Sequence, residues 1–134
     1  MKMRKRGGEA DVKLAVLPAE SDKFPRTAQA ITDSLRKAAV SGVDRTEVSK
    51  VSLEVVQLSI ECVEPTVECY QAVGKSLAAN RLLFAQVSGK KRQVKVTVTL
   101  FDVDAKAPKS AQKVFASEQD ATAGVADLVA EATR

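Results

Sequence analysis

The clearest pattern in the chain is a strict alternation of apolar and polar residues between positions 93 and 101. The apolar members are Val94, Val96, Val98 and Leu100, and the polar members between them are Lys95, Thr97 and Thr99. Successive side chains of a β-strand point to opposite faces of the sheet. The pattern therefore predicts a strand with one packed face and one face in water.

Two neighbouring segments extend this strand into a meander. Residues 81–87 (RLLFAQV) form an apolar run typical of a strand, and residues 88–92 (SGKKR) predict a hairpin turn in which Gly89 takes a positive φ. After a turn at 104–110, residues 112–117 (QKVFAS) predict a strand that pairs back.

The first half of the chain holds two more strand signals. Residues 12–18 (VKLAVLP) are a mostly apolar run stopped by proline, which favours a buried strand. Residues 43–51 are ambiguous, and we interpret 46–51 as a short edge strand.

Helical spacing is found in four segments. The first begins near Pro25 and is expected to end at Ser41-Gly42, with Gly42 in the left-handed conformation that follows a helix. Its apolar stripe consists of Ala28, Ile31, Leu35, Ala38 and Ala39. Further helices are predicted at 53–63, at about 66–77 and at 121–132, with Pro65 breaking the chain between the second and third.

These elements predict an α/β (α+β) domain with a mixed sheet of about five strands and helices packed on it. The expected order is β-α-β-α-α-β-β-β-α. No repeat or internal boundary interrupts residues 11–134, so they are expected to form a single domain behind a flexible basic tail at 1–10.

Charge modifies this picture at the amino terminus. The chain has 134 residues, 45% hydrophobic and 28% charged, with a net charge of +4. Removing the basic residues of the tail from the 21 in the chain leaves 17, equal to the 17 acidic residues. Those tail residues are Lys2, Arg4, Lys5 and Arg6. A nucleic-acid-binding fold carries its basic patch on the folded body, so binding to nucleic acid is not favoured.

The same tail resembles the charged start of a secretory signal, but no apolar region follows it. No run approaches the roughly 18 apolar residues of a membrane span. Two interpretations stay open: the protein is cytoplasmic, or a signal or lipoprotein leader has been lost. Membrane contact is expected only through such a leader or lipid anchor.

Cys62 and Cys69 are the first candidates for chemistry. They flank Pro65, and a helix-turn-helix could bring them within disulfide range, which would indicate an oxidising compartment. The alternative is two buried thiols that pack as small apolar groups. Two sulfurs without further ligands do not complete a zinc shell, and the spacing is not that of a redox-active pair.

Charged groups offer little further chemistry. Asp102 and Asp104 could bind calcium or act as an acid–base pair, but a turn in which they accept backbone hydrogen bonds is favoured. Glu61, Glu64 and Glu68 are interpreted as solvated surface. The tip residues Lys90, Lys91 and Arg92 could touch an anion, or could simply keep a strand end soluble.

Catalysis is not expected. The chain has no histidine, so no serine or threonine has an evident base partner. No cofactor, metal or small-molecule substrate is predicted.

Several segments together resemble the TolB amino-terminal-like domains of bacterial envelope proteins, related to the FlgO and LpoB type of module. The matching segments are LAVLP, QAITDSLRKAAV, CVEPTVECYQAVGKSLAANRLLFAQVSG and VKVTVTLFDVDAKAPKSAQKVFAS, followed by the closing helix. Two places depart from the family pattern: residues 77–80 replace a glycine-containing turn, and residues 104–106 replace a threonine-glycine. The resemblance implies a mixed sheet flanked by helices in a periplasmic or lipid-anchored, outer-membrane-associated protein that docks onto other envelope components, with no catalytic residues.

The expected function is therefore that of a non-enzymatic protein-interaction or assembly module of a bacterial cell envelope. An exposed sheet edge could accept a partner strand, and Val48 and Val114 mark the two edges to test. The alternative is a cytoplasmic nucleic-acid-associated or regulatory domain that uses the basic tail and the Lys90 to Arg92 hairpin.

Overall fold

The computed structural model describes residues 11–134, apart from the side chain of Lys90, so the predicted basic tail lies outside the described residues. The strands are β1 (Lys13–Val16), β2 (Arg45–Val48), β3 (Arg81–Lys90), β4 (Gln93–Asp102) and β5 (Ala107–Phe115). The helices are α1 (Pro25–Lys37), α2 (Leu53–Ser59), α3 (Val67–Ser76) and α4 (Glu118–Thr133). The predicted α+β class and element order are confirmed.

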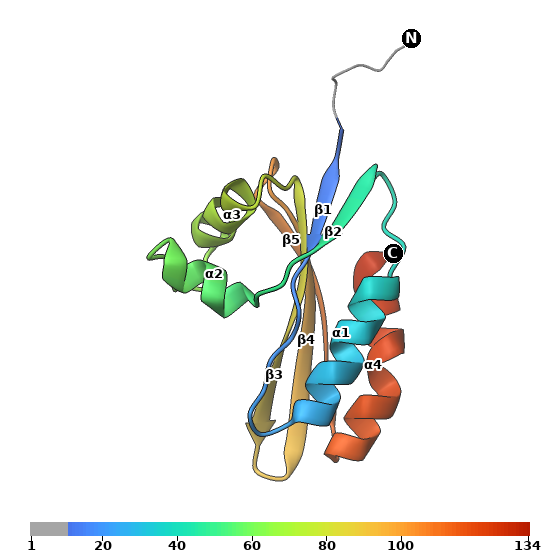
Figure 1. Ribbon diagram of the computed structural model, residues 1–134. Helices are drawn as coiled ribbons and strands as arrows, with labels where there is room; N and C mark the ends of the chain where they lie inside the picture. The colour runs from blue at the N-terminus through green and yellow to red at the C-terminus, as the bar shows by residue number, and fades with distance from the viewer. Residues whose placement is uncertain (1–10) are drawn as a thin grey trace.

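The five strands form one mixed sheet in the order β2-β1-β3-β4-β5. β1 runs parallel to both of its neighbours, whereas β3, β4 and β5 form an antiparallel meander. β2 and β5 therefore lie at the two edges of the sheet (Figure 1).

Helices cover both faces of the sheet, but unequally. α1 and α4 lie side by side on one face, and the shorter α2 and α3 lie on the other face near one end (Figure 1). Each face has its own apolar core. The first includes Ile31, Leu35, Val96, Val98, Val125 and Leu128, and the second includes Leu17, Val56, Val73, Leu82, Phe84 and Phe101.

β4 confirms the predicted strand and its packed face, but the opposite face is not in water, because Lys95 and Thr97 are half-buried and Thr99 is buried. Val94, Val96 and Val98 are buried against α1 and α4. Phe101 points to the opposite face, where its ring centroid lies 5.7 Å from that of Tyr70. One strand thus contributes side chains to both cores.

The β3–β4 hairpin differs from its prediction. β3 continues to Lys90, so the turn contains only Lys91 and Arg92, and Lys91 carries the positive φ of 60°. The left-handed conformation expected at Gly89 is therefore wrong. Gly89 lies within β3, and a Cβ there would come within 3.1 Å of the Phe24 ring. The missing side chain makes room for Phe24.

α1 ends earlier than its apolar stripe suggests. The last helical residue is Lys37, and Ala38 already has an extended backbone at φ −67° and ψ 136°. Ala38 and Val40 lie beyond the helix and pack against the α1–α4 core. The apolar pattern therefore continues past the end of α1 because these residues make tertiary contacts. Gly42 does have a positive φ of 79°, but in a later turn.

α2 also stops before its predicted end, well ahead of Pro65. The Glu61 N–H donates to Leu58 O at 3.2 Å and the Cys62 N–H to Gln57 O at 2.9 Å, with Glu61 at φ 58°. This pattern is a Schellman motif, which closes a helix end by satisfying its last carbonyl groups. Local hydrogen bonding, rather than proline, ends the helix.

The last two elements begin before their predicted starts. β5 begins at Ala107 instead of residue 112 and includes Pro108, as an edge strand permits. α4 begins at Glu118 because the Ser117 hydroxyl accepts from the Asp120 N–H at 3.1 Å and caps the helix. The connecting turns are correspondingly short.

Candidate interaction surfaces

β5 is the longer exposed edge of the sheet. Among the strands of residues 11–134 it pairs only with β4, and seven of its nine residues are exposed, the exceptions being Ala111 and Phe115. Val114, one of the predicted partner-binding residues, is 49% exposed on this strand. Such an edge can accept another strand unless something covers it.

The register shows which backbone groups of β5 point outward. Lys90 and Gln93 flank a two-residue turn, so they form the hydrogen-bonded closing pair of the hairpin. Along an antiparallel strand, the backbone N–H and C=O groups of successive residues point alternately to the two neighbouring strands. In β4, every second residue starting with Val94 therefore directs its backbone groups toward β5. The β5 residues left facing outward are Pro108, Ser110, Gln112 and Val114. Pro108 suits an outward-facing position because proline has no backbone N–H that would be left without a partner.

β2 is a shorter edge whose charges are already paired within the chain. Lys13 Nζ lies 2.5 Å from Glu47 Oε1 and donates to Leu77 O at 3.0 Å, and Arg45 Nε lies 2.6 Å from Asp11 Oδ2. The hydrogen bond from Lys13 and its charge lower the pKa of Glu47 below the usual glutamate value. Val48, at the end of this strand, is 40% exposed.

The basic hairpin tip is solvent-exposed. Lys91 and Arg92 are exposed in the turn, while the side chain of Lys90 is outside what the structure describes. The hairpin lies at the opposite end of the sheet from the start of β1 (Figure 1). Lys23, just before α1, lies near this hairpin, because its Cδ would be 3.9 Å from a Cβ placed on Gly89.

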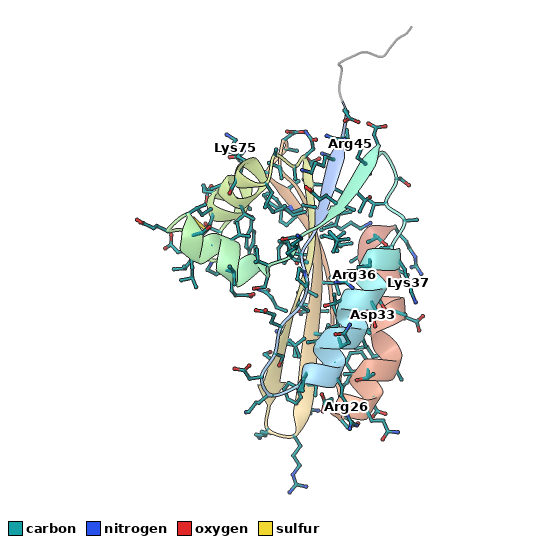
Figure 2. The ribbon with its side chains drawn as sticks, viewed as in Figure 1. Arg26, Asp33, Arg36, Lys37, Arg45 and Lys75 are labelled. Carbon is teal, nitrogen blue, oxygen red and sulfur yellow. A yellow bond between two sulfur atoms is a disulfide. The ribbon has the colours of Figure 1, made fainter. Side chains whose placement is uncertain are left out.

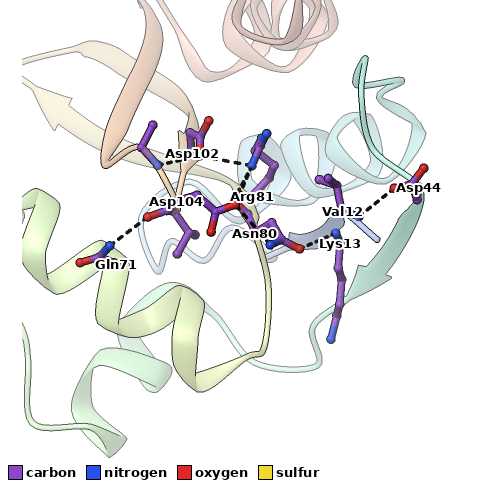
Figure 3. A network of polar contacts seen from close by, with 10 residues as sticks. Val12, Lys13, Asp44, Gln71, Asn80, Arg81, Asp102 and Asp104 are labelled. Atoms are coloured by element: carbon purple, nitrogen blue, oxygen red, sulfur yellow. Dashed lines mark hydrogen bonds and ion pairs between the residues drawn. The ribbon is translucent and has the colours of Figure 1, made fainter. Parts of the chain in front are cut away.

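Asp102 and Asp104 form a structural corner. Asp102 Oδ1 accepts from Arg81 Nη1 at 3.2 Å and from the Ala105 N–H at 3.0 Å. Asp104 Oδ2 accepts from Asn80 Nδ2 at 3.3 Å and lies 3.6 Å from the same Arg81 nitrogen (Figure 3). The carboxylates are thus engaged by a guanidinium and a turn. Among residues 11–134, no three metal-ligating side chains cluster.

Asn80 connects this corner to β1. Its side-chain oxygen accepts from the Lys13 N–H at 2.9 Å, and its backbone carbonyl accepts from the Val103 N–H at 2.9 Å (Figure 3). One residue in the loop before β3 therefore holds together segments that are far apart in sequence.

Cys62 and Cys69 form a disulfide that joins the end of α2 to the first turn of α3. Their Cα atoms are 5.7 Å apart. Cys69 is buried, Cys62 is half-buried, and the Thr66 hydroxyl caps α3 by accepting from the Cys69 N–H at 3.2 Å. The bond fixes the two short helices relative to each other.

A surface on α2 was not identified from the sequence. Val51, Val55, Leu58 and Val63 are all exposed around this helix. The sequence predicted a helix at 53–63, but it did not predict which of its sides is exposed. The buried side of α2 is instead formed by Leu53, Val56 and Gln57.

A groove of about 520 Å³ lies between the carboxyl ends of α1 and α4. Its lining includes the small side chains Ala38, Ala126 and Ala130, together with Lys37 and Arg134. These residues provide no acid–base or nucleophilic pair. Within residues 11–134, no helix is both long and apolar enough to span a membrane.

No protein-family model matches the chain, and no curated protein is significantly similar to it. Among solved structures, the LpoB C-terminal domain from Salmonella enterica has a TM-score of 0.48 and 18% identity, over 81% of this chain and 84% of that chain. The PelC dodecamer from Paraburkholderia phytofirmans has a TM-score of 0.47 and 15% identity, over 92% and 88% of the two chains.

TolB from Acinetobacter baumannii has a TM-score of 0.42 and 16% identity, over 92% of this chain but 28% of that chain. The LpoB and TolB structures match the kinds of envelope protein that the sequence resembles. Similarity at this level establishes neither a shared family nor a shared function.

Proposed function

We propose that residues 11–134 form a non-enzymatic protein-interaction module of a bacterial cell-envelope system, and that it captures a partner strand at β5. The sequence resemblance supports the envelope assignment, and the Cys62–Cys69 disulfide suits an oxidising compartment. Partners are other envelope proteins rather than small molecules or nucleic acid.

The observation that carries the proposal is the free edge of β5. Its outward N–H and C=O groups can pair with an added strand, which is the usual basis of strand addition. Lys109 and Lys113 lie on the inward-bonding positions, and their charges oppose uncontrolled edge pairing. β5 therefore combines an available backbone with protection against self-association.

β2 is the second edge that could serve, with Val48 at its end. It is less suited because it has four residues against nine in β5, and because Arg45 and Glu47 are held by neighbouring charges. The tip residues Lys91 and Arg92 are assigned to solubility of the hairpin. If these residues instead bound an anionic partner, the affinity for that partner would fall as salt is added.

Strand addition is tested by site-specific photo-crosslinking in the native host, with the photoreactive group at Gln112 and compared with Gln29 on α1. A single partner should crosslink from Gln112 but not from Gln29. Val114→Pro removes one outward N–H without removing a β4–β5 bond, and should reduce crosslinking by about tenfold.

Val114→Thr is the matched control, because it keeps the N–H and the β-branched shape. Circular dichroism and urea unfolding establish that both variants remain folded. Equal crosslinking by Val114→Pro and Val114→Thr would show that β5 does not pair with a partner strand.

Envelope location is tested separately by counting thiols in protein isolated from its native compartment. We expect Cys62 and Cys69 to react with a thiol reagent only after reduction. Two free thiols would contradict the envelope assignment and favour the cytoplasm, while leaving the β5 test unaffected.

A further inference from the structure

Exposed large apolar side chains are concentrated in one segment of the chain. Of the six large apolar residues exposed in the described part of the chain, five lie between positions 48 and 63, and the sixth is Val114. Leu58 and Val63 are the most exposed of them, at 67% and 62%. Scattered single apolar residues need no explanation, but a cluster of this kind marks an interaction surface.

The geometry of α2 displays this cluster on one side. Val55 and Leu58 are three residues apart within α2, which places them on one side of the helix, and Val51 lies just before the Ser52 cap. The Ser52 hydroxyl accepts from the Val55 N–H at 3.4 Å at the start of α2, and the Cys62–Cys69 disulfide restrains the chain beyond its end. The apolar side is therefore held in place before any partner arrives.

The segment that carries this cluster is acidic. Residues 51–74 contain four glutamates and no lysine or arginine, and the nearest basic residues along the chain are Lys50 and Lys75, which flank the segment. All four are exposed, and none forms an ion pair with another of the described side chains. They are Glu54, Glu61, Glu64 and Glu68. By contrast, Arg26, Arg36 and Lys37 lie on α1, on the other face of the sheet (Figure 2).

We infer that this acidic α2 surface, formed by the exposed side chains of residues 51–68, binds a basic amphipathic helix of a protein partner. The apolar side chains of that helix would cover Val55 and Leu58, and its lysines or arginines would face the glutamates. Opposite charges across the rim set orientation and raise the association rate. Anionic membranes, nucleic acids and acidic peptides are disfavoured because the glutamates repel them.

This interaction does not depend on β5. Helix-in-groove and strand addition are separate modes of recognition, and the two surfaces are formed by different elements. A variant of α2 can therefore lose its partner while the Val114 crosslinking result stays unchanged.

The experiment titrates a fluorescent synthetic helix into the oxidised full chain and follows fluorescence anisotropy. The helix carries leucines at three- and four-residue spacing and lysines elsewhere. Saturable one-to-one binding is expected, and it should weaken about tenfold or more in Leu58→Ser because a buried leucine contact is lost. Val114→Ser is the matched control and should bind as the parent chain does.

The charge arm uses the triple variant Glu61→Gln, Glu64→Gln and Glu68→Gln. It should bind several-fold more weakly than the parent at low salt and show a smaller response to added salt, because exposed charge pairs are screened. Glu131→Gln on α4 is the control for this arm. Unfolding midpoints of the serine and glutamine variants should match the parent, since all of these side chains are exposed.

Three results would overturn the inference. The first is no saturable binding of the lysine–leucine helix at low salt. The second is equal binding of a helix with glutamate in place of lysine. The third is equally tight binding of a peptide of residues 1–10, which would make the chain's own basic segment the occupant instead of an external partner.

Discussion

Reduction of the Cys62–Cys69 disulfide should destabilise the fold by a measurable amount. The bond closes a loop with a sequence separation of seven residues. In the chain-entropy description, closing a loop of this length removes enough freedom from the unfolded chain to stabilise the folded state by about 2.5 kcal/mol. Most of this effect acts on the unfolded state, so no large structural change is needed.

The assay is urea unfolding of the oxidised and the reduced protein, followed by circular dichroism. With a urea dependence of about 1–3 kcal/mol/M, the midpoint should fall by about 0.8–2.5 M on reduction. The double variant Cys62→Ala, Cys69→Ala is the control. It should unfold near the midpoint of the reduced protein and be insensitive to reductant.

The reasoning fails if oxidised and reduced protein share one midpoint. It also fails if the reductant shifts the control variant by the same amount as the parent. A further consequence concerns α2, because the bond restrains the chain that follows it. Reduction should weaken binding of the basic helix in the anisotropy assay even at urea concentrations where the sheet stays folded.

Other predictions concern packing and pH. Gly74→Ala should lose about 1–3 kcal/mol in urea unfolding, because the new Cβ would lie 2.9 Å from Val103 Cγ1; adding Val103→Ala should restore part of the loss, and no loss would contradict this packing. Lys13 lowers the pKa of Glu47, so the Glu47 carboxylate stabilises the folded state above the ordinary carboxyl pKa, and this stabilisation is lost as pH falls. Glu47→Gln and the parent should therefore converge in urea midpoint under acid, and a constant gap would refute the coupling. Burial raises the pKa of Tyr70, so stability should fall above the ordinary tyrosine pKa, and Tyr70→Phe should remove that fall.

The sheet was the most predictable part of the molecule. A run such as Val94 to Leu100 alternates so regularly that it predicts a strand with a packed face, and the structure confirms the strand and that face, although the opposite face is also partly covered. Element ends were less predictable because contacts from elsewhere decide them. Ala38 continues a helical stripe in sequence but packs on the core from an extended backbone, and Gly89 makes room for a ring that lies 65 positions earlier in the chain.

Of the two candidate surfaces, the β5 edge was predictable from the sequence and the exposed side of α2 was not. Val114 could be placed at an edge because it belongs to the last strand of a local meander. The exposed side of α2 could not be recognised, because Val55 and Val56 are adjacent and chemically identical. In a helix of seven residues, apolar positions occur on every side, and periodicity cannot show which side is buried. Only the packing of Val56 against the second core separates them.

The division of the sheet into a meander and two crossover strands has a consequence for the order of folding. β3, β4 and β5 are contiguous in sequence and close through short turns, so little chain entropy opposes their pairing. β1 and β2 pair in parallel, and β1 must find β3 across more than sixty intervening residues. We expect β1 to dock late. Val96→Ala should then slow folding with a high φ-value, whereas Val16→Ala should mainly accelerate unfolding, and the reverse pattern would show that the parallel strands nucleate the fold.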